Sequence, residues 1–305
     1  MTIKYNILWI ENDSDWQESI CDDIRDFIEE QGFELNVKVI AQQTAGTDYN
    51  RYDLILMDLN LADAPSGDEL IQQIRSLGVY TDVVFYSAGG IETIKQKGKE
   101  RDLEGVYYSG RNRDLFLSKV QSIIQTTIRK VQDLNNLRGL VMSEVSELDA
   151  LMEQIIESFF VTDERIKIFH EHVTSNREKS IKKSLVHPNP ESCDKKCVLT
   201  LRDKNIEEII KIIDSSQKAH AINEVLREVN QDGHLGFADG KFYQSYESEI
   251  ILVRNNLAHC DSYEINGQEV LRTRKGDLSF NTEDFVLIRK NISKYNKLFT
   301  QLLEI

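Results

Sequence analysis

The chain has 305 residues, of which 40% are hydrophobic and 29% charged, and it carries a net charge of −14. This length is typical of two domains, and the composition is that of a soluble globular protein rather than a fibrous or disordered one. No apolar run approaches the roughly 20 residues that cross a bilayer. The four cysteines are too scattered for a disulfide framework. A strand pattern begins within the first few residues, so we expect no signal peptide, no membrane partner and a cytoplasmic location.

Over the first 130 residues, hydrophobic runs alternate with amphipathic helical patterns. This alternation predicts an α/β domain whose parallel sheet has helices on both sides. The predicted strands are residues 6–10, 34–40, 54–57, 83–86 and 106–108. The predicted helices are residues 15–31, 67–77 and 114–130.

Polar side chains follow three of these strands. Glu11, Asn12 and Asp13 come after the first strand, Asp58 after the third and Ser87 after the fourth. Open α/β sheets place their sites at the carboxyl ends of strands, so we expect these groups to meet there. Clustered carboxylates can hold Mg²⁺, which would neutralise a phosphoryl group transferred to one of them.

Three segments resemble the receiver domain of response regulators: residues 52–61 (YDLILMDLNL), 67–71 (GDELI) and 84–88 (VFYSA). The resemblance covers residues 4–128. It implies a doubly wound, five-stranded, flavodoxin-like sheet, a phosphoacceptor at Asp58 and an upstream histidine kinase. It also implies that Ser87 is the switch residue that bonds the phosphoryl group, and that Mg²⁺ binds at Glu11, at Asp58 and at the backbone carbonyl of Asn60.

Two positions depart from the receiver pattern. Asn12 stands where a second carboxylate usually ligates the metal, and the next residue, Asp13, is a possible substitute. Ser109 stands where receivers have a lysine after the fifth strand, and Arg111 lies two residues further on. The alternative is therefore a degenerate receiver that takes no phosphate and serves as a dimerisation or docking surface.

The pattern of residues 131–305 predicts a helical bundle with a small β-hairpin. We place the domain boundary between residues 130 and 131. Helical pattern runs on to residue 160, and its apolar stripe, residues 140–156, is interpreted as core. Further helices are expected at 163–183, 204–215, 217–230, 242–259 and 284–303, with the hairpin at 262–274. Cys193 and Cys197 lack a second cysteine pair, so their spacing does not favour zinc.

Near the end of the 242–259 helix stands the sequence RNNLAH, from Arg254 through Asn255 to His259. An arginine can hold a phosphate, and a histidine can exchange a proton near neutral pH. The stretch resembles the Arg-x4-His motif of the HEPN superfamily, whose helical domains are often ribonucleases. The resemblance implies a homodimer with a composite cleft, in which Arg254 binds phosphate, His259 does acid–base work and Asn255 positions the substrate.

Two hypotheses follow for the whole chain. The first is a phosphorylation-regulated response regulator whose helical domain is a metal-independent endoribonuclease, with RNA as substrate and no cofactor at that site. The second is a non-catalytic, receiver-gated dimerisation or protein-interaction module. Arg254 and His259 are five residues apart, about 140° around a helix, so a rigid helix does not aim both at one point. The acidic net charge also counts against RNA binding.

Overall fold

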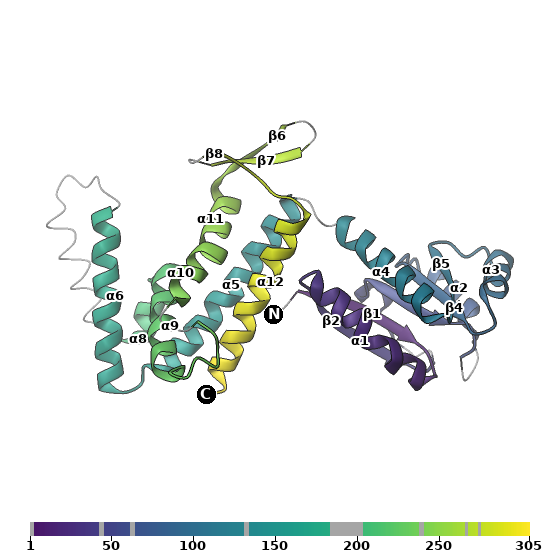
Figure 1. Ribbon diagram of the computed structural model, residues 1–305, viewed down its shortest axis with the longest axis horizontal. Coiled ribbons are helices and arrows are strands. Elements are labelled where there is room, and N and C mark those ends of the chain that lie inside the picture. Colours follow the sequence, from purple (N-terminus) through teal and green to yellow (C-terminus); the bar gives the residue numbers. More distant parts are fainter. Residues whose placement is uncertain are drawn as a thin grey trace. The chain divides into compact units, whose positions relative to one another are not determined.

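A computed structural model describes residues 3–42, 46–61, 65–130, 134–183, 204–237, 241–265, 268–273 and 276–305 (Figure 1). The chain divides into two compact units. One contains residues 2–133 with residues 282–290, and the other contains residues 134–281 with residues 291–305. No helix in the described ranges is long and apolar enough to span a membrane.

The N-terminal unit alternates strands and helices along the chain, as its sequence predicts. Its strands are β1 (Lys4–Ile10), β2 (Glu34–Ile40), β3 (Leu54–Asp58), β4 (Val83–Ser87) and β5 (Val106–Gly110). Its helices are α1 (Ser14–Glu30), α2 (Gly67–Ser76), α3 (Ile91–Glu100) and α4 (Arg113–Lys130), with a short 3₁₀ turn at Tyr49–Arg51. Helix α3 was not predicted from the sequence, because only Ile94 and Gly98 of its residues are buried.

Local capping explains where two of these helices begin. The carboxylate of Asp13 accepts a hydrogen bond from the backbone N–H of Trp16 and so caps the first turn of α1. Ser66 and Glu69 form a reciprocal capping box at the start of α2. These caps fix the path of the chain directly after β1 and shortly after β3.

All five strands are parallel, in the order β2-β1-β3-β4-β5. This is the flavodoxin-like order of doubly wound sheets. It confirms the predicted fold class for this unit. Because β1 lies between β2 and β3, the strand order reverses there, and the carboxyl ends of β1 and β3 are neighbours.

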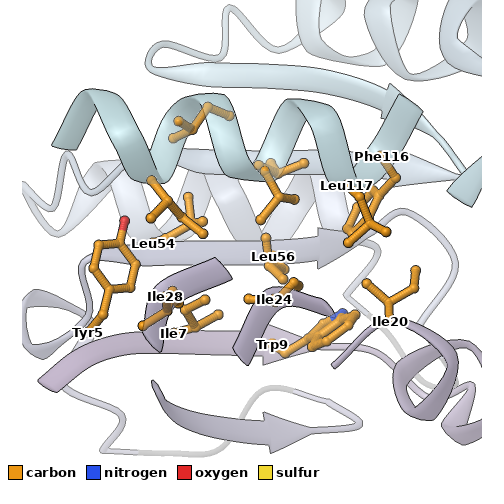
Figure 2. Close-up of a cluster of buried hydrophobic side chains, with 14 of the residues drawn as sticks. Tyr5, Ile7, Trp9, Ile20, Ile24, Ile28, Leu54, Leu56, Phe116 and Leu117 are labelled. Carbon is orange, nitrogen blue, oxygen red and sulfur yellow. The ribbon is translucent and has the colours of Figure 1, made fainter. Parts of the chain in front are cut away.

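Each face of the sheet has its own hydrophobic core, because successive side chains of a strand point to opposite faces. One core joins alternate residues of β1, β3 and β4 to α1 and α4. Figure 2 shows Ile7, Trp9 and Leu56 packed with Ile24 of α1 and Phe116 of α4. The other core joins Leu8, Ile55 and Phe85 to α2 and α3.

The C-terminal unit is mostly helical. Its helices are α5 (Leu134–Phe159), α6 (Asp163–Lys183), α8 (Ile206–Ile210), α9 (Ser215–Val229), α10 (Phe242–Tyr246), α11 (Leu252–His259) and α12 (Thr282–Leu303), which begins within the other unit. Helix α5 packs against α8, α9 and α11. Most of its predicted apolar stripe is buried, including Leu148, Met152 and Ile156, which confirms the interpretation as core.

Two features of this unit differ from the sequence-based expectation. The helix expected at residues 242–259 contains a π-helical turn, Glu247–Ile251, between α10 and α11. The expected hairpin is a three-stranded antiparallel sheet of β6 (Asp261–Ile265), β7 (Gln268–Thr273) and β8 (Gly276–Ser279). The four residues of β8 are too short and too exposed to show a strand pattern in the sequence. Cys193 and Cys197 lie outside the described residues.

Candidate functional site

The carboxyl ends of β1 and β3 bring two acidic residues to the point where the strand order reverses. Glu11 directly follows β1, and Asp58 is the last residue of β3. Both side chains are buried, with 1% and 2% of their surfaces exposed. Reversal points of this kind are where open α/β sheets bind their ligands. The sheet topology therefore supports the predicted position of the site.

Arg111, in the segment between β5 and α4, supplies the positive charge of this site. Its guanidinium contacts three carboxylates: Glu11 at 2.5 Å, Asp13 at 2.7 Å and Asp58 at 3.5 Å. The planar guanidinium suits such a role, because its donors spread in fixed directions. It also lies over the ring of Trp16, 5.4 Å from the ring centroid.

Glu11 is held by hydrogen bonds to both of its oxygens. Oε1 accepts from the backbone N–H groups of Asn12 and Asp13, each at 2.9 Å. Oε2 accepts from Arg111 and from the hydroxyl of Tyr86 at 2.9 Å. That hydroxyl in turn accepts from the indole N–H of Trp9 at 2.7 Å. Glu11 is thus fixed by two backbone N–H groups, by the hydroxyl of Tyr86, which Trp9 holds in place, and by Arg111.

Asp58 is less completely bonded than Glu11. Its Oδ2 accepts from the backbone N–H of Asn60 at 2.8 Å, whereas Oδ1 is buried without a hydrogen-bond partner among the described residues. Burial and the charge of Glu11 raise the pKa of Asp58, although Arg111 and nearby backbone N–H groups act in the opposite direction. Oδ1 is therefore an oxygen with unused lone pairs and raised basicity.

Ser87, at the end of β4, lies beside this carboxylate cluster. Its Oγ accepts hydrogen bonds from the backbone N–H of Gly89 at 3.1 Å and from the side chain of Asn60 at 3.4 Å. Because Ser87 accepts in both bonds, its own hydroxyl proton can be donated to a further group. Asn60 thus joins the ends of β3 and β4.

Gly67, the first residue of α2, packs directly against the backbone at the end of β3. Its backbone N–H donates to the carbonyl of Leu59 at 3.0 Å. A Cβ atom at this position would lie 2.1 Å from the backbone oxygen of Asp58. Only glycine permits so close an approach to the strand end.

The predicted Mg²⁺ ligands are only partly assembled. The exposed residue Asn12 donates its backbone N–H to Glu11, and Asp13 supplies the second carboxylate. Within the described ranges, no three His, Cys, Asp or Glu side chains are already arranged to hold a metal ion. The three carboxylates surround Arg111 instead. Their hard oxygen donors fit Mg²⁺ in chemistry, and Oδ1 of Asp58 accepts no hydrogen bond from the described residues, but binding requires Arg111 to give up part of its contacts.

The residue that stands in place of the receiver lysine does not reach the site. Ser109 is buried, and its hydroxyl donates to the backbone oxygen of Gly110. Arg111, two residues later, occupies the cluster in its place. The sequence placed Arg111 near the missing lysine, but it predicted no role for Tyr86 or Trp9. Their alternation along β4 and β1 indicated burial, but nothing in the pattern indicated that they hold Glu11.

In the C-terminal unit, Arg254 belongs to a polar network between α5, α9 and α11. Its guanidinium donates to the hydroxyl of Ser215 at 3.1 Å, and that hydroxyl donates to the carboxylate of Asp149 at 2.6 Å. Burial raises the pKa of Asp149, against the effects of Ser215, Lys218 and Arg254. Lys218 pairs with Glu153 at 2.6 Å in the same region. The sequence motif did not reveal these partners.

The structure does not bring the three predicted catalytic residues together within one chain. His259 is exposed at the C-terminal end of α11, and Asn255 is partly exposed. Arg254 points toward α9 and α5, and among the described residues no direct contact joins it to His259. This agrees with the helical spacing, which turns Arg254 and His259 to different sides of α11.

No protein-family model matches the chain, and a search of curated proteins finds no match either. Among solved structures, the chain is similar to a two-component response regulator from Clostridium difficile, with 23% identity and a TM-score of 0.31. That similarity covers 40% of this chain and 96% of the other. CheY4 from Vibrio cholerae has 18% identity and a TM-score of 0.30, covering 40% of this chain and 99% of its own.

A third similar structure is the phosphorylated cyanobacterial phytochrome response regulator RcpA. It has 20% identity and a TM-score of 0.31, with 41% of this chain and 94% of RcpA covered. The identities are below 25%, so the fold of residues 4–130 is assigned from the strand order and the helix placement described above.

Proposed function

We propose that residues 1–130 form a receiver domain that accepts a phosphoryl group on Asp58 and regulates the helical domain, residues 131–305. The observation that carries this proposal is that Oδ1 of Asp58 is buried and accepts no hydrogen bond from the described residues. This oxygen lies 3.5 Å from the guanidinium of Arg111. An oxygen with free lone pairs beside a fixed cation is suited to attack phosphorus.

In the proposed transfer, Oδ1 of Asp58 forms a bond to phosphorus while the P–N bond of a kinase phosphohistidine breaks. The electron pair of that bond stays with the histidine. Arg111 contacts the phosphoryl oxygens in place of the usual lysine, and Ser87 donates its hydroxyl proton to one of them. Mg²⁺, when bound to Asp13, Asp58 and the carbonyl of Asn60 beside Glu11, would neutralise charge on the phosphoryl group.

Incubation with a small phosphodonor, acetyl phosphate, in the presence of Mg²⁺ tests this proposal. Intact-protein mass should show one added phosphoryl group on the wild type and none on Asp58→Asn. Asp15→Asn is the matched control, because Asp15 is an exposed carboxylate close to the site in sequence but outside the cluster. An unmodified wild type, or a modified Asp58→Asn, would favour the degenerate receiver.

For the helical domain, we propose metal-independent RNA cleavage by Arg254 and His259. The Arg-x4-His resemblance and the exposure of His259 at the end of α11 support this. The 2′-oxygen of the RNA attacks phosphorus, the bond to the 5′-oxygen breaks, and a 2′,3′-cyclic phosphate is left. His259 removes or supplies the proton, Arg254 binds the phosphate and Asn255 positions the substrate. The cleft would be completed by a second copy of the chain.

Labelled RNA incubated with purified protein in EDTA tests this activity, with and without acetyl phosphate pretreatment. His259→Ala should abolish cyclic-phosphate products, whereas His234→Ala should keep them. His234 is a suitable control because it is an exposed histidine of the same unit that pairs with Asp232. Analytical ultracentrifugation of the same samples would show whether a dimer is present.

A specific observation favours the alternative, a non-catalytic dimerisation or protein-interaction module. The network of Arg254, Ser215 and Asp149 gives the arginine a structural role within its own unit. Under this alternative, His259→Ala and the wild type behave alike in the RNA assay. Phosphorylation of Asp58 would then change the self-association or partner binding of the chain and leave RNA intact.

A further inference from the structure

Tyr86 carries a phenol hydroxyl into the core that α1 and α4 share with one face of the sheet. The residue belongs to β4, is fully buried and directly precedes Ser87 of the candidate site. Burial of a hydroxyl is costly unless the group is hydrogen-bonded, so a phenylalanine would fill this position at lower cost if packing alone mattered. The bonds that the hydroxyl makes therefore indicate what the tyrosine contributes.

Two sets of contacts fix the hydroxyl of Tyr86. It accepts a hydrogen bond from the indole N–H of Trp9 at 2.7 Å and donates one to Oε2 of Glu11 at 2.9 Å. An indole N–H can only donate, so the proton of the hydroxyl is left for the carboxylate. The rings of Tyr86 and Trp9 both pack on Phe116, with centroids 4.8 and 6.5 Å away. The hydroxyl is thus a donor with one direction, aimed at Glu11.

The oxygen that receives this bond also holds Arg111. Oε2 of Glu11 accepts from the guanidinium at 2.5 Å, and the same amino group lies 3.5 Å from Oδ1 of Asp58. Oε1 of Glu11 accepts from two backbone N–H groups, which fix one end of the carboxylate. The terminal torsion of glutamate is broad, so the second oxygen needs a partner of its own to hold its direction. The Tyr86 hydroxyl is that partner, and it acts on Asp58 through Glu11 and Arg111.

We propose that Tyr86, with its hydroxyl held by Trp9, is a positioning residue for phosphoryl transfer to Asp58. The role rests on the proposed function of the N-terminal domain. Tyr86 fixes Glu11, Glu11 fixes Arg111, and Arg111 meets the phosphoryl oxygens while Oδ1 of Asp58 forms its bond to phosphorus. At metal sites, replacing a residue that orients a ligand typically costs about 10- to 100-fold in activity, which sets the scale expected here.

The rate of phosphorylation by acetyl phosphate with Mg²⁺, followed by intact-protein mass, tests this role. At saturating acetyl phosphate, Tyr86→Phe should react at least about tenfold more slowly than the wild type. The donor concentration that gives half the maximal rate should stay unchanged, because the fully buried hydroxyl does not meet the donor. Tyr5→Phe is the control and should match the wild type. Tyr5 is buried in the same core (Figure 2) but stands at the amino end of β1, whereas Glu11 follows the carboxyl end.

A double-variant cycle separates positioning from a general loss of packing. Trp9→Phe removes the N–H that holds the Tyr86 hydroxyl and keeps an aromatic ring, so it should also slow phosphorylation. In the Tyr86→Phe background the same change should have little further effect, because the hydroxyl through which Trp9 acts is gone. Equal factors in both backgrounds would mean that the two residues act independently, and would overturn the proposal. Circular dichroism and urea unfolding verify that each variant is folded.

A second measurement needs neither Mg²⁺ nor a phosphodonor. Phenylglyoxal modifies accessible arginine side chains, and peptide mass spectrometry can compare Arg111 with Arg113 in the same sample. Arg111 is shielded among the carboxylates, with 18% of its side chain exposed, whereas 50% of the Arg113 side chain is exposed. In Tyr86→Phe, with EDTA present, Arg111 should react at least about threefold faster relative to Arg113, because a hydrogen bond that holds its partner Glu11 is lost. An unchanged ratio would contradict the positioning of Arg111 by Tyr86.

The outcomes separate this role from the proposed function. A wild type that takes up no phosphoryl group contradicts phosphorylation of Asp58 and this role together. A wild type that is phosphorylated at the same rate as Tyr86→Phe contradicts only the role of Tyr86. The proposed function then rests on Asp58, Arg111 and Ser87 without it.

Discussion

The carboxylate cluster of the N-terminal unit and the Arg-x4-His segment of the C-terminal unit are built in opposite ways. At the cluster, Glu11 and Asp13 after β1 and Asp58 at the end of β3 converge on the guanidinium of Arg111, which follows β5. In the C-terminal unit, Arg254 and His259 stand on a single helix and have different surroundings. A parallel sheet brings its strand ends together by topology, whereas a helix spreads its residues around an axis.

This difference predicts that the strand-end site is sensitive to small changes in backbone packing. Gly67→Ala should lower the free energy of unfolding by roughly 3 kcal/mol, because the new methyl group would overlap the backbone oxygen of Asp58. Gly139→Ala, in the interior of α5, is the matched control. Among the described residues, no atom outside the backbone of its own helix and its two chain neighbours lies within 4 Å of its added Cβ, so it should gain roughly 0.5–1 kcal/mol. Denaturant unfolding measures both changes. If Gly67→Ala and Gly139→Ala changed the free energy of unfolding in the same direction, this expectation would be contradicted.

The two residues of the Arg-x4-His segment should differ in their effects on stability. Arg254→Ala removes a cation from the neighbourhood of the buried Asp149, so we expect a loss of roughly 2 kcal/mol. His259→Ala, on an exposed side chain, should stay within about 0.5 kcal/mol of the wild type. The loss in Arg254→Ala should shrink at acid pH, where Asp149 takes up a proton, because only its ionised form needs the cation. If Arg254→Ala and His259→Ala lowered the melting temperature by the same amount, the expected difference between the two residues would be wrong.

Arg111 should compete with Mg²⁺ for the carboxylates of the cluster. Arg111→Ala removes a positive charge from beside Glu11 and Asp58, so Mg²⁺ affinity should rise at least about tenfold. Tryptophan fluorescence can follow the titration, because the ring of Trp16 lies against Arg111. Arg113→Ala is the control, since Arg113 pairs with Asp23 away from the cluster. An unchanged or weaker affinity in Arg111→Ala would show that the arginine does not occupy the metal position.

The smallest expected effect concerns Glu144 of α5. Burial raises the pKa of this carboxyl from 4.5 to about 7. Between these values the folded protein keeps a proton that the unfolded chain has lost, so stability falls as the pH rises through this window. Glu144→Gln should remove that dependence and gain at least about 1 kcal/mol at pH 8 relative to the wild type, with a smaller gain at pH 5. Urea unfolding at the two pH values measures this, and parallel curves for the two proteins would contradict it.

Much of the N-terminal fold could be predicted from the sequence, because the central strands β1, β3 and β4 are apolar runs that end in polar residues. The relevant signals are all local in the sequence. They are the buried runs in β1 and β3, the caps at Asp13 and Ser66, and the acidic residues Glu11 and Asp58 at the strand ends. Helix α3 was missed because few of its residues are buried, and β8 because it is short and exposed. The π-helical turn before Arg254 has no distinct sequence pattern.

The sequence by itself determined the parallel sheet, the helical second half and the identity of the acidic residues at the strand ends, because hydrophobic periodicity and capping are local properties of the chain. Only the tertiary structure decided that Arg111 lies among the carboxylates, that Tyr86 and Trp9 hold Glu11, and that Arg254 pairs with Ser215. These contacts join residues far apart in the chain. A long side chain can reach several partners, and the packing of the folded elements selects one of them.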